Sequence, residues 1–249
     1  MIDSVVFNDR ISQAGRLKRS RIILAVDLAD RSDLQETTIR TISSLEEHIC
    51  AVKFNFHLIL PLSRSELLQI NRLAHSYGLQ SIADIKLNDI PSTNEVAITH
   101  LAKMGFDAFT VNPFIGPDGL EATVLHAHEL GCGILALIYM SHTGAHSGFG
   151  ANLLEGDNKV TPIYRRFFEN ATNSQVDGMV VGANRTDILK EVSCKTDKIP
   201  IYSPGLGVQG GDAKQASISG TDYFIVGRSI IQSKDPIMAI TQLRETLNH

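Results

Sequence analysis

The amino-acid sequence predicts an α/β protein with the fold of a (β/α)8 TIM barrel in a single domain. Eight short apolar segments alternate with segments of helical periodicity, and the 249 residues are close to the length that such a barrel needs. Polar residues also stand at the carboxyl ends of many apolar segments. A closed barrel collects such residues around one rim, whereas an open doubly wound sheet, the alternative fold, concentrates its site at one switch point.

The predicted strands are short apolar runs bounded by turn-forming residues. The first is continuously apolar and ends in an acid, as expected for a strand of a parallel sheet that is buried on both faces. The eight strands are predicted at residues 21–27, 49–56, 80–86, 107–112, 133–139, 176–181, 199–203 and 221–226. The polar residues toward their carboxyl ends or just beyond are Asp27, Lys53, Asp84, Lys86, Asn112, Ser141, Ser203 and Arg228.

The predicted helices lie between these strands. The strongest begins at Ser63, where Glu66 completes a capping box, and ends before Gly78. The helices are predicted at residues 34–45, 63–77, 91–103, 117–130, 161–171, 185–192, 212–219 and 236–247. No linker or shift in composition indicates a second domain, so residues 21–249 form the barrel, the catalytic domain. We interpret residues 1–20 as an N-terminal extension, a candidate helix, that packs outside the main fold.

Composition indicates an ordinary globular protein, with 43% apolar and 20% charged residues. The net charge of −4 gives no support to nucleic-acid binding. No apolar run reaches the length of a membrane span, and the N-terminus lacks the pattern of a secretory signal. The three cysteines, Cys50, Cys132 and Cys194, form neither a C-x-x-C pair nor a disulfide framework. They favour buried thiols in a reducing compartment, which we expect to be the cytoplasm.

The segment at residues 81–94 is the centre of the predicted site. Its strand carries Asp84 and Lys86, whose side chains point the same way because strand side chains alternate between faces, with Cα atoms about 6.5–7 Å apart. A lone D-x-K pattern is usually a surface salt bridge. This strand is too apolar to be an edge, however, and Asp89, Thr93 and Asn94 follow at once. That concentration of polar groups predicts a site at the end of the strand.

Two glycine-rich loops near the end of the chain predict a phosphate site. Residues 203–212 contain the spacing G-x-G-x-x-G, but a dinucleotide fold is disfavoured because only one more strand follows. Glycines let backbone N–H groups approach an anion, and the following helix presents its N-terminus. Gly227 and Arg228 end the next strand, and loops after strands seven and eight commonly bind phosphate in barrels. Gln209 is a candidate contact. The alternative is that these glycines only form tight turns.

The long polar segment at residues 141–158 predicts a lid that closes over substrate, with a mobile surface connection as the alternative. Ser141, at its root, is placed to hydrogen-bond a bound base. His142 and His146 lie four apart, which suggests a metal. The glycines around them disfavour a helix that would hold that spacing, and carboxylates are sparse here, so we expect no metal site.

The pattern D-x-K-x-x-D-I-P-x-T at residues 84–93 resembles the signature of the orotidine 5′-monophosphate decarboxylases. The resemblance extends to Asp27, Lys53 and the segments at residues 141–145, 204–211 and 227–228. It covers the chain from about Arg21 to the C-terminus and is closest in order and spacing to the compact archaeal-type branch. Thr143, where the family often has proline, and Phe54-Asn55, where glycine often follows the lysine, are departures.

The resemblance implies the conversion of orotidine 5′-monophosphate to UMP and CO2 in de novo pyrimidine biosynthesis, without a metal or an organic cofactor. It implies that Lys86 protonates C6 of the pyrimidine and that Asp84 sits beside the substrate carboxylate. Lys53, Asp84, Lys86 and Asp89 would form an alternating array of charges. Loss of CO2 leaves an anion on a ring carbon with little resonance help, so a positive charge at that point stabilises the transition state and can deliver the proton.

The resemblance also implies how the substrate is bound. Asp27 and Lys53 hold ribose hydroxyls, Ser141 contacts the base, and Gln209 and Arg228 hold the phosphate. The full set of implied substrate-binding residues is Asp27, Lys53, Asp84, Thr93, Ser141, Pro204, Gly205, Gln209, Gly227 and Arg228. In the family the residues corresponding to Asp89 and Thr93 reach into the neighbouring subunit's site, so a homodimer is expected.

Two alternatives remain at this stage. A related Mg²⁺-dependent hexulose-phosphate synthase or keto-gulonate-phosphate decarboxylase shares the D-x-K-x-x-D frame but uses it to hold Mg²⁺ against an enediolate. Such enzymes usually lack the Ile-Pro-x-Thr continuation at residues 90–93. A non-catalytic phosphate- or nucleotide-binding barrel is the alternative from another class. The presence of Lys86 with its flanking aspartates disfavours it.

Overall fold

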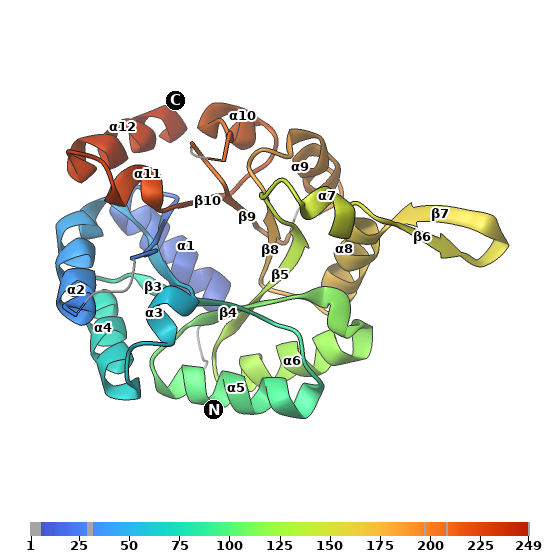
Figure 1. The fold of residues 1–249 in the computed structure, drawn as a ribbon, viewed down its shortest axis with the longest axis horizontal. Coiled ribbons are helices and arrows are strands. Elements are labelled where there is room, and N and C mark those ends of the chain that lie inside the picture. Colours follow the sequence, from blue (N-terminus) through green and yellow to red (C-terminus); the bar gives the residue numbers. More distant parts are fainter. Residues whose placement is uncertain (1–5, 29–31, 197, 208, 249) are drawn as a thin grey trace.

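Eight parallel strands close into a barrel in the order β1-β10-β9-β8-β5-β4-β3-β2 (Figure 1). The structure is a computed structural model that describes residues 6–28, 32–196, 198–207 and 209–248. The barrel strands are β1 (Ile22–Ala25), β2 (Ala51–Phe54), β3 (Gln80–Leu87), β4 (Ala108–Val111), β5 (Gly133–Tyr139), β8 (Gly178–Val181), β9 (Ile201–Pro204) and β10 (Tyr223–Val226). All eight predicted strands and the predicted closed barrel are confirmed.

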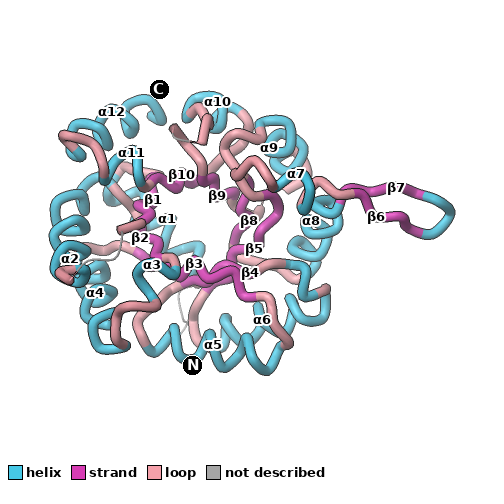
Figure 2. The backbone as a smooth tube through the Cα atoms, in the orientation of Figure 1, coloured by secondary structure: helices cyan, strands magenta, loops and turns pink. Residues whose placement is uncertain are grey.

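Helices surround the ring of strands on the outside (Figure 2). They are α2 (Leu34–Leu45), α4 (Arg64–Ser76), α5 (Pro91–Lys103), α6 (Pro117–Glu129), α8 (Ile163–Asn173), α9 (Thr186–Ser193), α10 (Ala213–Ile218) and α12 (Pro236–Asn248), with the 3-10 turns η1 (Glu46–His48) and η2 (Pro113–Ile115). The predicted capping box of α4 is present: the Glu66 N–H donates to Ser63 Oγ and the Ser63 N–H donates to Glu66 Oε2. Short helices α3 (Phe56–Ile59), α7 (Ala145–Gly148) and α11 (Arg228–Ile231) were not predicted.

None of the helices in the described ranges combines the length and hydropathy that crossing a bilayer requires.

The strands are buried on both sides, which explains their continuous apolar runs. Along β1, Ile23 and Ala25 belong to the cluster inside the barrel, while Ile22 and Leu24 belong to the cluster between strands and helices. This alternation follows from the two-residue period of a strand. Most positions of a barrel strand are therefore apolar until the strand reaches the carboxyl end of the barrel.

Helix α1 (Phe7–Lys18) closes the amino-terminal end of the barrel and lies behind the strands in Figure 1. Phe7, Ile11 and Ala14 are buried in the interior cluster, and the expectation that this segment packs outside the main fold is wrong. The three residues form one apolar helical face, and Gly133 leaves room for it: a Cβ there would lie 2.6 Å from the Phe7 ring. Residues 1–5 of the predicted extension lie outside the described residues, and the domain boundary at residue 20 stays a prediction.

A two-stranded antiparallel hairpin, β6 (Asn152–Glu155) and β7 (Lys159–Pro162), with the turn η3 (Gly156–Asn158), projects from the barrel beside α8 (Figure 1). It occupies the second half of the segment predicted as a lid at residues 141–158. This half is therefore a hairpin and not an irregular loop, and its closure over substrate stays a prediction. Leu154 and Val160 form a cross-strand pair in it. The physical reason is that residues 152–155 and 159–162 carry enough apolar and β-branched side chains to pair with each other.

The cysteines are free, and two of the three are buried as expected. Burial raises the pKa of the Cys50 thiol to about 12 and that of Cys132 to about 12, which makes both poor nucleophiles. Cys194 is exposed, contrary to the expectation. It follows the last turn of α9, at the surface of the outer layer.

Candidate active site

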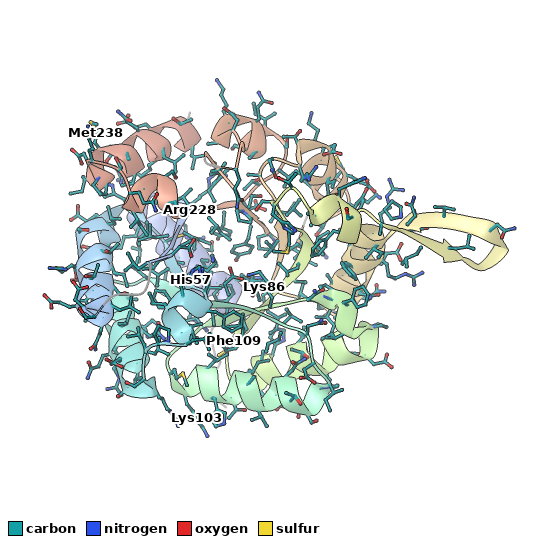
Figure 3. All side chains as sticks on the ribbon, viewed as in Figure 1. His57, Lys86, Lys103, Phe109, Arg228 and Met238 are labelled. Carbon is teal, nitrogen blue, oxygen red and sulfur yellow. The ribbon has the colours of Figure 1, made fainter. Side chains whose placement is uncertain are left out.

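All eight barrel strands, or the loops directly after them, contribute to one cavity of about 230 Å³ at the carboxyl ends of the strands. Figure 3 shows Lys86 near the middle of the ring of strands and Arg228 toward the rim, near α11. The cavity is lined by Ala25, Asp27, Lys53, Asn55, Asp84, Lys86, Thr110, Leu137, Met140, Ser141, Val180, Pro204, Gly205, Leu206, Gln209, Ile225, Val226, Gly227, Arg228 and Ser229. The predicted convergence of strand-end polar residues on one rim is therefore found for most of the predicted site.

Asp84 lies between two lysines in the wall of this cavity. Lys53 Nζ is 2.5 Å from Asp84 Oδ2, and Lys86 Nζ is 2.7 Å from Asp84 Oδ1. The Asp84 side chain is 14% exposed. Burial by itself raises the pKa of Asp84, but the charges and hydrogen bonds of Lys53 and Lys86 outweigh that effect and hold the pKa well below its usual range. The cluster therefore carries an ionised carboxylate that fixes the two ammonium groups.

The loops after β5, β9 and β10 meet on the opposite side of the cavity. Ser141 Oγ donates a hydrogen bond of 2.6 Å to Gln209 Oε1. Gly205, at φ +95°, permits this contact, because a Cβ on it would lie 2.6 Å from Ser141 Cβ and 2.8 Å from Gln209 Oε1. Gly227 is similarly required, since its Cβ would lie 2.8 Å from the Ala25 carbonyl oxygen. Arg228 follows and begins α11, with its guanidinium available at the rim.

Apolar side chains complete the lining, among them Leu137, Met140, Val180, Leu206 and Ile225. Leu137, Val180 and Ile225 also belong to the interior cluster, so the cavity rests on the core of the barrel. An apolar surface facing fixed charges and hydrogen-bonding groups suits a flat ring with polar substituents. The arrangement thus combines a wall of paired charges, an apolar surface and a cationic rim.

Several lining residues were missed by sequence reasoning. Asn55 Nδ2 donates to Asp27 Oδ1 at 2.7 Å, which orients that carboxylate. Thr110 Oγ1 donates to Asp84 Oδ1 at 3.0 Å. Asn55 directly follows β2, so its place at a strand end was a usable signal. Thr110 lies within β4 and looks like any β-branched strand residue, so the sequence alone gave no signal.

Two predicted site residues, Asp89 and Thr93, do not line the cavity and are exposed. Asp89 Oδ1 accepts the N–H of Ile90. Two other strand-end polar residues serve the fold instead: Asn112 Oδ1 accepts the Phe114 N–H, and Ser203 Oγ is hydrogen-bonded to Thr221.

Potential metal ligands are not clustered in the part of the chain that the structure describes, where no group of three or more His, Cys, Asp or Glu is arranged to hold an ion. His142 and His146 do not share a helix, because α7 begins at Ala145. This agrees with the reasoning that glycines disfavour a helical His pair.

The fold and the site together define a (β/α)8-barrel enzyme with a Lys–Asp–Lys centre at the carboxyl ends of its strands. The chain belongs to the orotidine 5′-phosphate decarboxylase / HUMPS family, whose model matches residues 20–243.

The similarity to known proteins extends over most of the chain. It is 33% identical to the orotidine 5′-phosphate decarboxylase of Pyrococcus abyssi over 227 residues, which is 91% of this chain and 98% of that protein. It is 33% identical to the enzyme of the same name from Thermococcus kodakarensis over 232 residues, 93% of this chain and 98% of that protein. The crystal structure of orotidine 5′-monophosphate decarboxylase from Methanocaldococcus jannaschii, complexed with the inhibitor BMP, superposes with a TM-score of 0.78 at 28% identity, covering 92% of this chain and 98% of that one.

Proposed function

We propose that the chain is an orotidine 5′-monophosphate decarboxylase, which converts orotidine 5′-monophosphate to UMP and CO2 in de novo pyrimidine biosynthesis. The observation that carries the proposal is the Lys53–Asp84–Lys86 cluster in the cavity wall, in a chain of this family. A carboxylate held between two ammonium groups at the mouth of a barrel suits a reaction that develops negative charge on carbon.

Substrate binding is divided among three parts of the cavity. Asp27, oriented by Asn55, and Lys53 are the ribose contacts, and Ser141 contacts the base. The phosphate is held by Gln209 and Arg228. Pro204, Gly205 and Gly227 shape the backbone around it. The support for this division is that all these residues line the same cavity and that the Arg228 guanidinium is a forked donor suited to phosphate.

The chemical step breaks the bond between C6 and the substrate carboxylate, and its electron pair stays on C6 as CO2 leaves. The ammonium of Lys86 stabilises this pair and then gives its proton to C6, which yields UMP. Solvent returns a proton to the Lys86 amine. Asp84 lies beside the departing carboxylate and, at 2.7 Å from Lys86 Nζ, holds the ammonium in place. This step needs neither a metal nor an organic cofactor.

The direct experiment is to measure CO2 release from orotidine 5′-monophosphate by the wild-type enzyme and by Lys86→Ala. We expect the wild type to decarboxylate the substrate and Lys86→Ala to lose nearly all turnover while keeping its melting temperature. Lys103→Ala is the control, because Lys103 is exposed on α5, away from the mouth (Figure 3). Near-wild-type kcat in Lys86→Ala would show that Lys86 is not the proton donor.

The Mg²⁺-dependent alternatives are not favoured. Both oxygens of Asp84 already accept hydrogen bonds from ammonium groups, which leaves this carboxylate poorly placed to bind a cation. The relatives named above are decarboxylases of orotidine 5′-monophosphate. Assays with and without EDTA separate the two chemistries: we expect unchanged turnover in EDTA, and loss that Mg²⁺ restores would support the alternative.

We further propose that the enzyme is a homodimer in which Asp89 and Thr93 act in the neighbouring subunit's site, completing the charge array there. Both residues are exposed and outside their own cavity, and the neighbouring apolar side chains of Ile90 and Val96 are exposed as well. Apolar side chains exposed beside Asp89 and Thr93 are groups that a subunit interface at this place would cover.

Subunit mixing tests this arrangement. We expect Lys86→Ala and Asp89→Ala to be nearly inactive alone. After subunit exchange, activity should recover to about one quarter of wild type, because half of the dimers are mixed and each mixed dimer holds one intact site. If Asp89 acts within its own subunit, no mixed dimer has an intact site and mixing restores nothing. A monomer by sedimentation would also contradict the proposal.

The cytoplasm is the proposed location, in keeping with buried free thiols at Cys50 and Cys132. Fractionation of cells that express the tagged chain checks this. Recovery of the chain with membranes or outside the cell would contradict it.

A further inference from the structure

The backbone of β3 is irregular at the residue that carries the central ammonium. Between two paired positions β3 advances four residues, from Ala83 to Leu87, while β4 advances only two, from Phe109 to Val111. Lys86 lies in this bulge with φ +50°, in the left-handed region that non-glycine residues rarely adopt. The direction of its side chain therefore depends on whatever holds this unfavourable backbone in place.

Thr110, the β4 residue opposite the bulge, contacts both charged residues through one hydroxyl. Its Oγ1 accepts the backbone N–H of Lys86 at 2.9 Å and donates to Asp84 Oδ1 at 3.0 Å. The same Oδ1 accepts Lys86 Nζ at 2.7 Å. These three hydrogen bonds close a ring that runs through the main chain and the ammonium of Lys86. Thr110 is 3% exposed, so water does not readily replace it.

The bulge removes the Lys86 N–H from the regular ladder, and the Thr110 hydroxyl takes the place of a strand carbonyl as its acceptor. A buried N–H without an acceptor is unfavourable, so loss of the hydroxyl favours relaxation of Lys86 toward an extended backbone. That change would redirect the lysine side chain, because the φ and ψ of Lys86 set the direction in which its Cβ leaves the strand. Loss of the Thr110 hydroxyl would also remove one of the hydrogen-bond donors that fix the Asp84 carboxylate.

We propose that Thr110 is a positioning residue for the decarboxylation: its hydroxyl locks the left-handed backbone of Lys86 and the carboxylate of Asp84 so that the ammonium is aimed at C6 of the substrate. The inference rests on the proposed role of Lys86 as proton donor. Threonine suits the task because its hydroxyl both donates and accepts and its branched Cβ restricts rotation. Valine has nearly the same shape and can do neither.

The test compares Thr110→Val, Thr110→Ser and a control, Thr123→Val. Thr123 is buried on α6, where its Oγ1 donates to the Gly119 carbonyl, so the control removes an equally buried hydroxyl far from the cavity. For Thr110→Val we expect kcat to fall roughly 10- to 100-fold, as misplacement of a reacting group does, with little change in KM. Its melting temperature should fall no further than that of Thr123→Val. Thr110→Ser should restore most of kcat.

The outcomes separate this inference from the proposed function. Wild-type kcat in Thr110→Val, alongside an inactive Lys86→Ala, would overturn the role of Thr110 and leave the function standing. Equal loss of kcat in Thr110→Ser and Thr110→Val would also overturn it, because the hydroxyl would then not be the group that matters. Absence of CO2 release by the wild type would overturn the proposed function and this inference with it.

Discussion

At the scale of single residues, the site depends on a few close approaches that only particular side chains allow. Gly205 lies where the loop after β9 meets Ser141, and Gly227 lies against the carbonyl of Ala25. Neither position has room for a Cβ. The glycine pattern predicts an anion-binding loop, and in the structure Gly205 also permits the hydrogen bond between Ser141 and Gln209.

We expect Gly205→Ala to lower kcat/KM by roughly 10-fold or more, because its Cβ would push Ser141 and Gln209 apart. Gly210→Ala is the matched control. Gly210 lies in the same loop at φ +83°, but nothing lies within 4 Å of the position of its Cβ. Both variants carry the strain of a left-handed alanine, about 1 kcal/mol, and only Gly205→Ala adds the clash. Steady-state kinetics of the pair check this, and equal losses in both would refute the steric explanation.

Arg228→Ala should chiefly harm capture of the phosphorylated substrate. Loss of a charge-assisted hydrogen bond corresponds to roughly a 10- to 100-fold fall in kcat/KM. Arg228→Lys should recover part of it, because lysine keeps the charge but not the forked geometry. Unchanged kcat/KM in Arg228→Ala would count against the phosphate assignment.

At the scale of elements, the sequence predicted what depends on local pattern and missed what depends on tertiary context. Buried strands and capped helices were found because their apolar runs and caps are local signals, as at Ser63 of α4. Helix α1 was misplaced because its apolar face packs against strands distant in sequence. The role of Thr110 could not be predicted, because it depends on the bulge of β3, which packs against Thr110 only in the folded barrel. The hairpin was not predicted, because the glycines at the start of residues 141–158 favour a loop over the whole segment.

The hairpin offers an element-scale prediction. Leu153 and Thr161 already pair, so replacing residues 154–160 with Asn-Gly would close a two-residue turn between them. Because the removed part projects from the barrel (Figure 1), we expect a melting temperature close to that of the wild type and kcat/KM within about twofold. Thermal unfolding and kinetics measure both. A large loss of activity would show that the hairpin contributes to the site or to dimer assembly.

At the scale of the whole molecule, a ring of aspartates joins strands at the end of the barrel opposite the cavity. Asp107, Asp177 and Asp222 precede β4, β8 and β10, and their carboxylates accept backbone N–H groups from neighbouring strands. Two of them also bind histidines. His75 is 2.8 Å from Asp107, and His128 is 2.9 Å from Asp177. These hydrogen bonds raise the pKa of both histidines above the ordinary 6.5.

The two histidines bound to this ring make the free energy of unfolding depend on pH, and the direction of their pKa shifts fixes the sign. A histidine whose folded pKa is raised contributes fully below the unfolded pKa near 6.5, and its contribution is lost as pH rises through the folded pKa. We therefore expect the double variant His75→Gln, His128→Gln to lose more unfolding free energy at about pH 5.5 than at about pH 8.5. The side chains are 38% and 41% exposed, so screening limits each effect to roughly a few tenths of a kcal/mol.

Denaturant unfolding at the two pH values measures that difference. His100→Gln is the control, since His100 is exposed on α5 and none of the described carboxylates pairs with it. A loss in the double variant that is independent of pH would contradict the assignment.

The pairing of β1 with β10 has a consequence for synthesis in the cell. The two partners are encoded near opposite ends of the chain, at Ile22–Ala25 and Tyr223–Val226. Because β1 leaves the ribosome long before β10, the backbone N–H and C=O groups on that edge of β1 stay unpaired during most of synthesis. We expect nascent chains arrested before residue 221 to be protease-sensitive and held by chaperones, and to become resistant only on release of the final segment. Resistance acquired earlier would mean that the ring closes by another route.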